Sequence, residues 1–288
     1  MTSTRYYSLD IIKILATVGI MFHHYQQIFH VEYSVINFYG GTFNCGYLVE
    51  LFFLISGFLA YSSIMSRPKP LIRDFIHRAV RIYPMAMISC AIYLGIWLFY
   101  EDSFGKSIYL TEKHDFGNII RSFLLIPQPI GQLALNNPTW YLAILIQCFI
   151  LLEVCRYLWH RYSFLAKWLP VMVVILCTIA KLTHMPCEIF YAMYCRGIIP
   201  FFIGIIIYQL LQMKDKYSSI INLLFCILLL GTILAICIKP EWSIAHQQLL
   251  LMFGIYPTLV YYLLNMKQII NISYIYIYIY NLCKHGIV

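Results

Sequence analysis

Residues 219–238 read Ser-Ile-Ile-Asn-Leu-Leu-Phe-Cys-Ile-Leu-Leu-Leu-Gly-Thr-Ile-Leu-Ala-Ile-Cys-Ile, without a charged side chain. An α-helix needs about 20 mostly apolar residues to cross the hydrocarbon core of a bilayer. This stretch therefore predicts a transmembrane helix. Similar apolar stretches occur at 9–29, 46–65, 83–100, 140–158, 165–182, 196–212, 247–265 and 268–282. The sequence thus predicts an all-α, polytopic transmembrane bundle of about nine spanning helices.

The composition supports this class. Of the 288 residues, 61% are hydrophobic and only 11% are charged, and the mean hydropathy is +0.76. Soluble domains carry about 25% charged residues, so a water-soluble fold is excluded. The net charge of +8 lies between the apolar stretches, where basic residues set membrane topology. We therefore expect the lipid bilayer, and no nucleic acid, as a partner.

Basic residues also predict the orientation of the chain. With the N-terminus on the cytoplasmic side, twelve lysines and arginines fall on inner segments and seven on outer ones, which agrees with the positive-inside rule. The stretch 9–29 lacks a small-residue cleavage site, so it is expected to be a retained helix. Without internal repeats, residues 1–288 form one predicted domain, with an outer loop at about 101–139.

The first predicted helix carries several ionisable side chains, which are costly inside a bilayer and are functional candidates by default. Asp10 lies in the first turn, where it suits the helix dipole, and Lys13 could simply reach the inner headgroups. His23 and His24 lie near the outer end. Lys13 and His24 are eleven residues apart, which is about 16 Å along the axis and about 20° from the same face.

The second predicted helix carries Glu50 near its outer end, at nearly the depth of His24. A buried carboxylate beside an imidazole would orient the ring and raise its basicity, so the two residues form a predicted dyad. Farther along, Ser56 precedes Gly57. We favour close helix packing for this pair over a serine nucleophile.

The inner segment 66–84 is rich in basic residues, with Arg73, His77 and Arg81 at intervals of four and Arg78 beside them. The cluster could simply follow the positive-inside rule. Two arginines on adjacent turns also suit a nucleotide phosphate, because each guanidinium can bind two oxygens. Pro84 is expected to end this segment and begin the next span.

Four segments of the first half occur in a characteristic order. They are Leu-Asp-x-x-Lys at 9–13 with a histidine eleven residues after the lysine, Glu-Leu-Phe-Phe-x-x-Ser-Gly-Phe at 50–58, Arg-x-x-Arg-x-x-Pro at 78–84 and Pro-Thr-Trp-Tyr-Leu at 138–142. Together they resemble the signatures of the integral-membrane acyltransferase-3 family of bacterial membrane O-acyltransferases. The family has arginine where this chain has Lys13, so bidentate contacts are not available there.

The resemblance implies an activity. A cytoplasmic acyl-coenzyme A, expected to be acetyl-CoA, would donate its acyl group to a hydroxyl of an extracytoplasmic cell-envelope glycan or lipid-linked sugar. The implied location is the bacterial cytoplasmic membrane, and no permanently bound cofactor or metal is expected. By the same resemblance His24 would be the catalytic base, beside Glu50. The donor phosphates would bind to Lys13, Arg78 and Arg81, and the further candidates are Asp10, Ser56 and Trp140.

The C-terminal part departs from the family. Ile272-Ser273-Tyr274 resembles the start of a late family element, but alternating tyrosine and isoleucine then continue to Tyr280. A TA-dinucleotide repeat would encode this run, and slippage in it would shift the reading frame. We therefore expect a truncated product of a longer gene, and an inactive product is an alternative to the enzyme. A naturally short member with an interfacial tyrosine belt is the other explanation of the run.

Two other hypotheses stay open. Buried charges also occur in transporters, so a flippase for a lipid-linked sugar is the second hypothesis. A structural subunit is the third, although it would not explain the basic cluster. The ten cysteines show no metal-ligand spacing. Cys187 and Cys195 share a predicted loop, and their bridging is left open.

Overall fold

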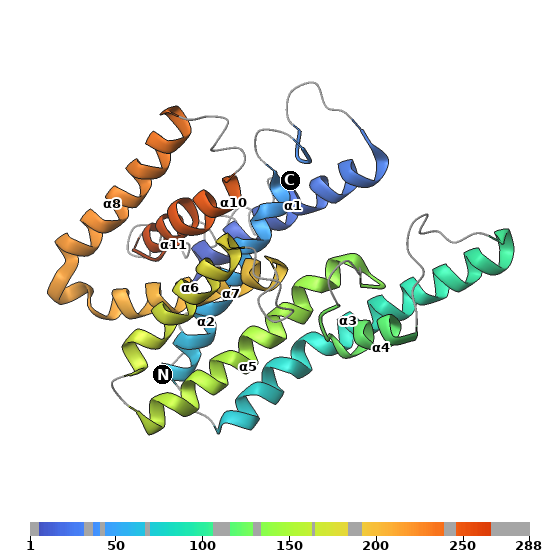
Figure 1. Ribbon diagram of the computed structural model, residues 1–288, viewed down its shortest axis with the longest axis horizontal. Helices are drawn as coiled ribbons and strands as arrows, with labels where there is room; N and C mark the ends of the chain where they lie inside the picture. The colour runs from blue at the N-terminus through green and yellow to red at the C-terminus, as the bar shows by residue number, and fades with distance from the viewer. Residues whose placement is uncertain are drawn as a thin grey trace, which may run out of the picture. The chain divides into compact units, whose positions relative to one another are not determined.

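The computed structural model describes residues 6–31, 37–40, 44–66, 70–105, 116–128, 134–162, 165–183, 192–238 and 246–265. The helices in the first half are α1 (Tyr7–Phe29), η1 (Cys45–Tyr47), α2 (Leu48–Ser66), α3 (Leu71–Phe104), α4 (Phe116–Leu124), η2 (Asn137–Thr139) and α5 (Trp140–Arg161). Those in the second half are α6 (Leu165–Leu182), α7 (Ala192–Gln212), α8 (Lys214–Ile238), α10 (Gln247–Leu250), the π-helical turn η4 (Leu251–Ile255) and α11 (Tyr256–Asn265). Figure 1 shows these elements.

The predicted all-α membrane class is confirmed. Six helices in the described ranges are long and apolar enough to cross a membrane, and Trp168–Leu182 is a shorter apolar helix. Helix α1 forms where the first span was predicted, but its Asp, Lys, His and Gln side chains keep it outside this set of six. The span predicted at 268–282, with its tyrosine and isoleucine repeat, lies outside the described residues.

Helix α3 corrects the expectation for Pro84. The helix is continuous over 34 residues, with Pro84 in its interior, so Arg73, Arg78 and Arg81 lie on the same element as the next span. A proline costs its helix one backbone hydrogen bond, and this loss can be tolerated within a membrane bundle. At 1.5 Å per residue α3 is about 51 Å long, well over the 30 Å of the hydrocarbon core. Part of it must therefore extend beyond the bilayer.

The described chain forms two compact units. Unit 1 comprises residues 1–55 and 210–288, and unit 2 comprises residues 56–209. In unit 1, helix α1 packs against η1 and α11. It buries Leu9, Ala16 and His23 at seven-residue intervals, which place these side chains on one face of the helix. The first and last described helices of the chain therefore share one core.

In unit 2, helices α3 and α5 pack against each other, and α5 also packs against α6. Helices α2 and α7 come into close backbone contact at Gly57. A Cβ atom added at Gly57 would lie only 1.9 Å from the carbonyl oxygen of Phe201. This contact supports the packing interpretation of the Ser56–Gly57 pair, because only glycine lets two backbones come so near.

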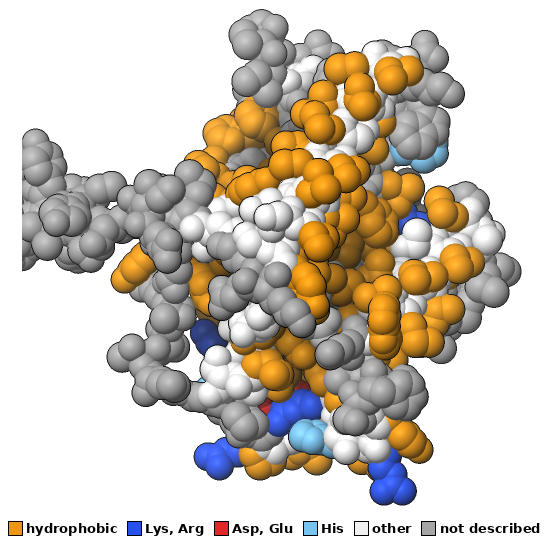
Figure 2. Space-filling model, turned by 90° about the vertical axis from the view of Figure 1, so that its left-hand side faces the viewer, with side chains coloured by type: hydrophobic (Ala, Val, Ile, Leu, Met, Phe, Trp, Pro, Cys, Tyr) orange, Lys and Arg blue, Asp and Glu red, His pale blue; other side chains and the backbone are white. Residues whose placement is uncertain are grey.

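The surface suits a lipid environment. Several leucine, isoleucine and phenylalanine side chains on α3 and α8 are more than half exposed, for example Phe99 at 71% and Leu230 at 58%. Hydrophobic side chains cover much of the face in Figure 2. Such a surface would aggregate in water, so it is expected to face lipid tails.

Candidate active site

A buried polar cluster in unit 1 includes the C-terminal half of α1. The His23 side chain is only 7% exposed, and its Nδ1 lies 3.1 Å from the carbonyl oxygen of Phe38. Gln26 accepts the backbone N–H groups of Phe38 and Tyr39 at 2.8 and 2.9 Å. The segment after α1 is thus attached to the same helix turn as His23.

The His23 ring also lies against Gly46 in η1. A Cβ atom at Gly46 would lie 2.8 Å from both Cε1 and Nε2 of the ring, so a larger residue there would displace the imidazole. With Nδ1 at a carbonyl oxygen, the neutral ring would carry its proton on Nδ1 and keep the Nε2 lone pair as an acceptor. The motif-based prediction chose His24 and did not anticipate this environment for His23.

Glu50, four residues after Gly46, is fully buried at 0% exposure. Its Oε1 accepts a 2.6 Å hydrogen bond from Nε2 of Gln248 in α10. The neighbouring Gln247 accepts from the backbone N–H of Asn44 at 3.4 Å. Segments about 200 residues apart in sequence are therefore joined around the carboxylate.

His24 has different surroundings. Its Nδ1 lies 3.2 Å from Oε1 of Gln27 on the same helix, and its ring packs edge-on against His23 at 5.1 Å. His24 and Glu50 thus each contact a different glutamine. The dyad of these two residues stays a prediction.

The inner half of α1 carries the predicted phosphate ligand Lys13. Its Nζ forms a 2.7 Å ion pair with Oδ1 of Asp10, and each side chain is about one third exposed, at 32% and 31%. Asp10 is thus a direct partner of Lys13 as well as a first-turn acid. An ion pair this exposed is weak, so the ammonium can exchange its partner.

A second charged network lies in unit 2. Nη2 of Arg78 is 2.9 Å from Oδ2 of Asp74 and donates to the carbonyl oxygen of Ala60 at 3.2 Å. Nη1 of Arg156 lies 3.8 Å from the same Asp74 oxygen and 3.3 Å from Glu153. The four side chains are 6–15% exposed. Two arginines and two acids thus neutralise each other between α3 and α5.

The two arginines that were predicted to bind the phosphates of the acyl donor therefore differ in their surroundings. The guanidinium of Arg78 lies over the ring of Phe149 at 5.3 Å, and its Nε is a buried donor without a hydrogen-bond partner among the described residues. Arg81, three residues later on α3, is exposed, as is His77. Arg78 belongs to a packed interior network, whereas Arg81 is accessible to a ligand.

Ser56 and Trp140 also have partners in unit 2. Ser56 shares a side-chain hydrogen bond with Tyr141, and the guanidinium of Arg196 lies 4.9 Å from the Trp140 ring. This is a cation–π distance. The partner of Ser56 is thus a phenol, whereas a serine nucleophile needs a neighbouring base.

Metal chemistry has no support in the described part of the chain, where no group of three or more His, Cys, Asp or Glu side chains could hold an ion. None of the eight cysteines described there forms a disulfide bond with another of them. Cys195 is hydrogen-bonded to Cys177, and Cys187 lies outside the described residues.

Sequence reasoning missed Asp74, Glu153, Arg156 and Gln248. Asp74 stands four residues before Arg78, and Glu153 stands three before Arg156. Helical neighbours at these intervals can pair, so this signal was present. Gln248 could not be found in this way, because its approach to Glu50 depends on the tertiary fold.

Long apolar helices with charged side chains buried among them define a polytopic membrane protein. The chain belongs to the acyltransferase-3 family, because the family model, described as an acyltransferase domain, matches residues 6–280. It is therefore a membrane acyltransferase. Comparisons with curated proteins and with solved structures gave no match.

Proposed function

We propose that this protein transfers an acyl group, expected to be acetyl, from cytoplasmic acyl-coenzyme A to a hydroxyl of an extracytoplasmic glycan or lipid-linked sugar in the bacterial cytoplasmic membrane. The observation that carries the proposal is the complete burial of Glu50, whose Oε1 accepts a hydrogen bond from Gln248. A carboxylate inside a membrane bundle is costly and is usually retained for function. The family supplies the reaction class.

The chemistry needs a base at the acceptor. In the proposed step the imidazole of His24 removes the hydroxyl proton while the oxygen attacks the thioester carbonyl. A carbon–oxygen bond forms, the carbon–sulfur bond breaks, and the proton passes from the imidazolium to the coenzyme A thiolate. Glu50 would stabilise the imidazolium through the field of its carboxylate, because an opposite charge nearby favours the charged ring.

Arg81 and Lys13 would bind the donor phosphates. Arg81 is exposed, and the ion pair of Lys13 is weak enough to exchange. Arg78 would offer one unpaired Nε–H while Asp74 holds its guanidinium in place. Donor binding would thus depend on all three cations, but for different reasons.

Binding of acyl-coenzyme A to the purified protein in lipid nanodiscs tests the enzyme hypothesis against the flippase alternative. Calorimetry should detect saturable binding, and radiolabelled acetyl-CoA should label a membrane glycan. Absence of both would overturn the proposal, and movement of a lipid-linked sugar without donor binding would establish the flippase. Comparing the glycans of a deletion strain with the parent would identify the acceptor.

A further inference from the structure

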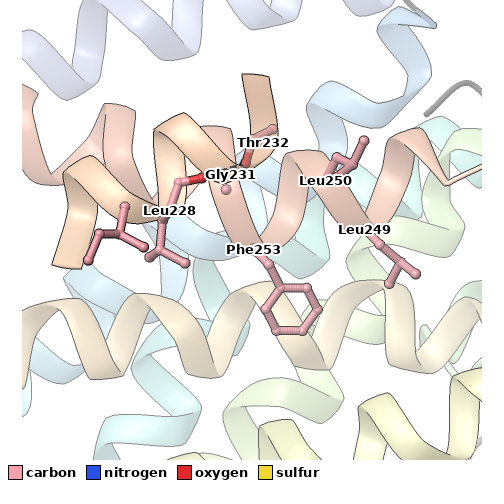
Figure 3. Close-up of a pocket in the computed structure, with 8 residues that line it drawn as sticks. Leu228, Gly231, Thr232, Leu249, Leu250 and Phe253 are labelled. Carbon is pink, nitrogen blue, oxygen red and sulfur yellow. Dashed lines mark hydrogen bonds between the residues drawn. The ribbon is translucent and has the colours of Figure 1, made fainter. Parts of the chain in front are cut away.

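A pocket of about 330 Å³ lies in unit 1 between α8 and the segment formed by α10 and η4. Figure 3 shows Leu228, Gly231 and Thr232 on one side, with Leu249, Leu250 and Phe253 on the other. The Thr232 hydroxyl donates to the Leu228 carbonyl of its own helix at 2.7 Å. The lining therefore offers hydrocarbon contacts and almost no free polar group.

Two glycines show how the pocket forms. A Cβ atom at Gly254 would lie 1.9 Å from Oγ1 of Thr232, so η4 and α8 touch there. A Cβ atom at Gly231 would have nothing within 4 Å. The helices thus touch at one point and leave a space beside it. Neighbouring Ile227 is 57% exposed, so this space is open to the apolar surface of α8.

The pocket and the candidate site share one helical segment. Gln248 donates to Glu50, and the next two residues, Leu249 and Leu250, line the pocket. Gly254 follows Gln248 by six residues, which is about 9 Å along a helix. One short segment thus presents a polar contact to the buried carboxylate and an apolar wall to a neighbouring space.

We infer that this pocket binds the hydrocarbon chain of a lipid-anchored acceptor, whose hydroxyl-bearing head would lie beside Glu50. The inference rests on the proposed function and narrows its acceptor to a lipid-linked molecule. A polymer in the aqueous phase has no chain for such a pocket. The volume is about twice that of an apolar cavity of about 150 Å³ that takes up benzene, so it suits part of a chain.

The perturbation is Gly231→Phe, which places a ring in the open space without meeting the backbone of another helix. Gly95 in α3 is the matched control, because a Cβ atom there also has nothing within 4 Å and Gly95 does not line the pocket. Replacing glycine within a helix is not expected to reduce helix stability. Both variants should therefore fold.

The first assay needs no acyl transfer. The protein in nanodiscs is photolabelled with a dodecyl glucoside that carries a diazirine in its alkyl chain, and the labelled peptides are mapped. We expect labelling of α8 and of α10–η4, reduced by Gly231→Phe and unchanged by Gly95→Phe. Exclusion of two or three methylene groups predicts a loss of roughly 10- to 100-fold in affinity.

Phosphatidylcholine with the same diazirine tests the alternative occupant. Equal labelling of these peptides by both probes, with the same response to Gly231→Phe, would assign the pocket to bulk lipid and overturn the inference. Unchanged glucoside labelling in Gly231→Phe would overturn it as well. If the glucoside labels as expected but the protein neither binds acyl-coenzyme A nor transfers its acyl group, the proposed function fails while the pocket assignment stands.

Discussion

Adjacent histidines at the outer end of α1 offer the sharpest test of the proposed chemistry. The perturbations are His24→Ala, which removes the proposed base, and His23→Asn, which removes the neighbouring ring but keeps a donor near its Nδ1 position. We expect His24→Ala to lower acyl transfer by roughly 10²- to 10⁴-fold, the usual contribution of general-base catalysis. His23→Asn should retain most of the activity.

The structure sets the expected stability cost at His23. Its Nδ1 contacts the Phe38 carbonyl, which also accepts from the backbone N–H of Cys45 at 3.0 Å. Loss of the His23 contact would therefore not leave this carbonyl without a partner. His23→Ala should cost about 0.5–1.5 kcal/mol for the hydrogen bond, plus a packing loss where the ring lies against Gly46. His23→Asn should avoid most of the first cost.

The assay compares initial rates with labelled acetyl-CoA in proteoliposomes, normalised to the folded protein measured by size-exclusion chromatography. Thermal unfolding in detergent measures the stability of each variant. A similar fall in rate for both variants, at equal amounts of folded protein, would refute the assignment of one base. Full activity of His24→Ala with loss in His23→Asn would transfer the role to His23, whose ring is the more buried.

Three further predictions concern the carboxylate and the two arginines. Glu50→Gln should keep the fold, because the amide oxygen can still accept from Gln248, and should lower turnover roughly 10- to 100-fold; wild-type turnover would remove Glu50 from the chemistry. Arg81→Ala should weaken donor binding in calorimetry at an unchanged unfolding temperature, whereas Arg78→Ala should lower both; unchanged donor affinity in both variants would leave only a topological role. Asp74→Ala should destabilise unit 2 by about 3–5 kcal/mol, since it leaves the Arg78 guanidinium without its acidic partner; an unchanged unfolding temperature would contradict this expectation.

Apolar length was sufficient to predict most of the helices. It failed to predict the extent of α3, where a proline suggested a boundary that the helix passes through. The physical reason is that the bilayer core offers an unpaired backbone carbonyl few hydrogen-bond donors. Continuing the helix therefore costs less free energy there than ending it. The basic residues before Pro84 thus belong to the same rigid element as the apolar span.

The candidate site was only partly predictable. Motif spacing selected Glu50 and His24 rather than His23, but it could not show which imidazole turns inward. That depends on Gly46, on the Phe38 carbonyl and on α11 packing against α1. These contacts join segments that are distant in sequence, so the helical periodicity of the sequence does not predict them.

The exposure of each cation decides which ones are available to the donor. The Lys13–Asp10 pair is about one third exposed on each side, and such pairs contribute at most about 1 kcal/mol. In the proposed donor site a phosphate, which carries more negative charge than a carboxylate, would compete with Asp10 for the Lys13 ammonium. Arg78 is different, because its Asp74 partner is buried and also lies near Arg156. Removing Arg78 from that network would leave two buried acids with Arg156 alone, so in the proposed donor site Arg78 would act from within the network.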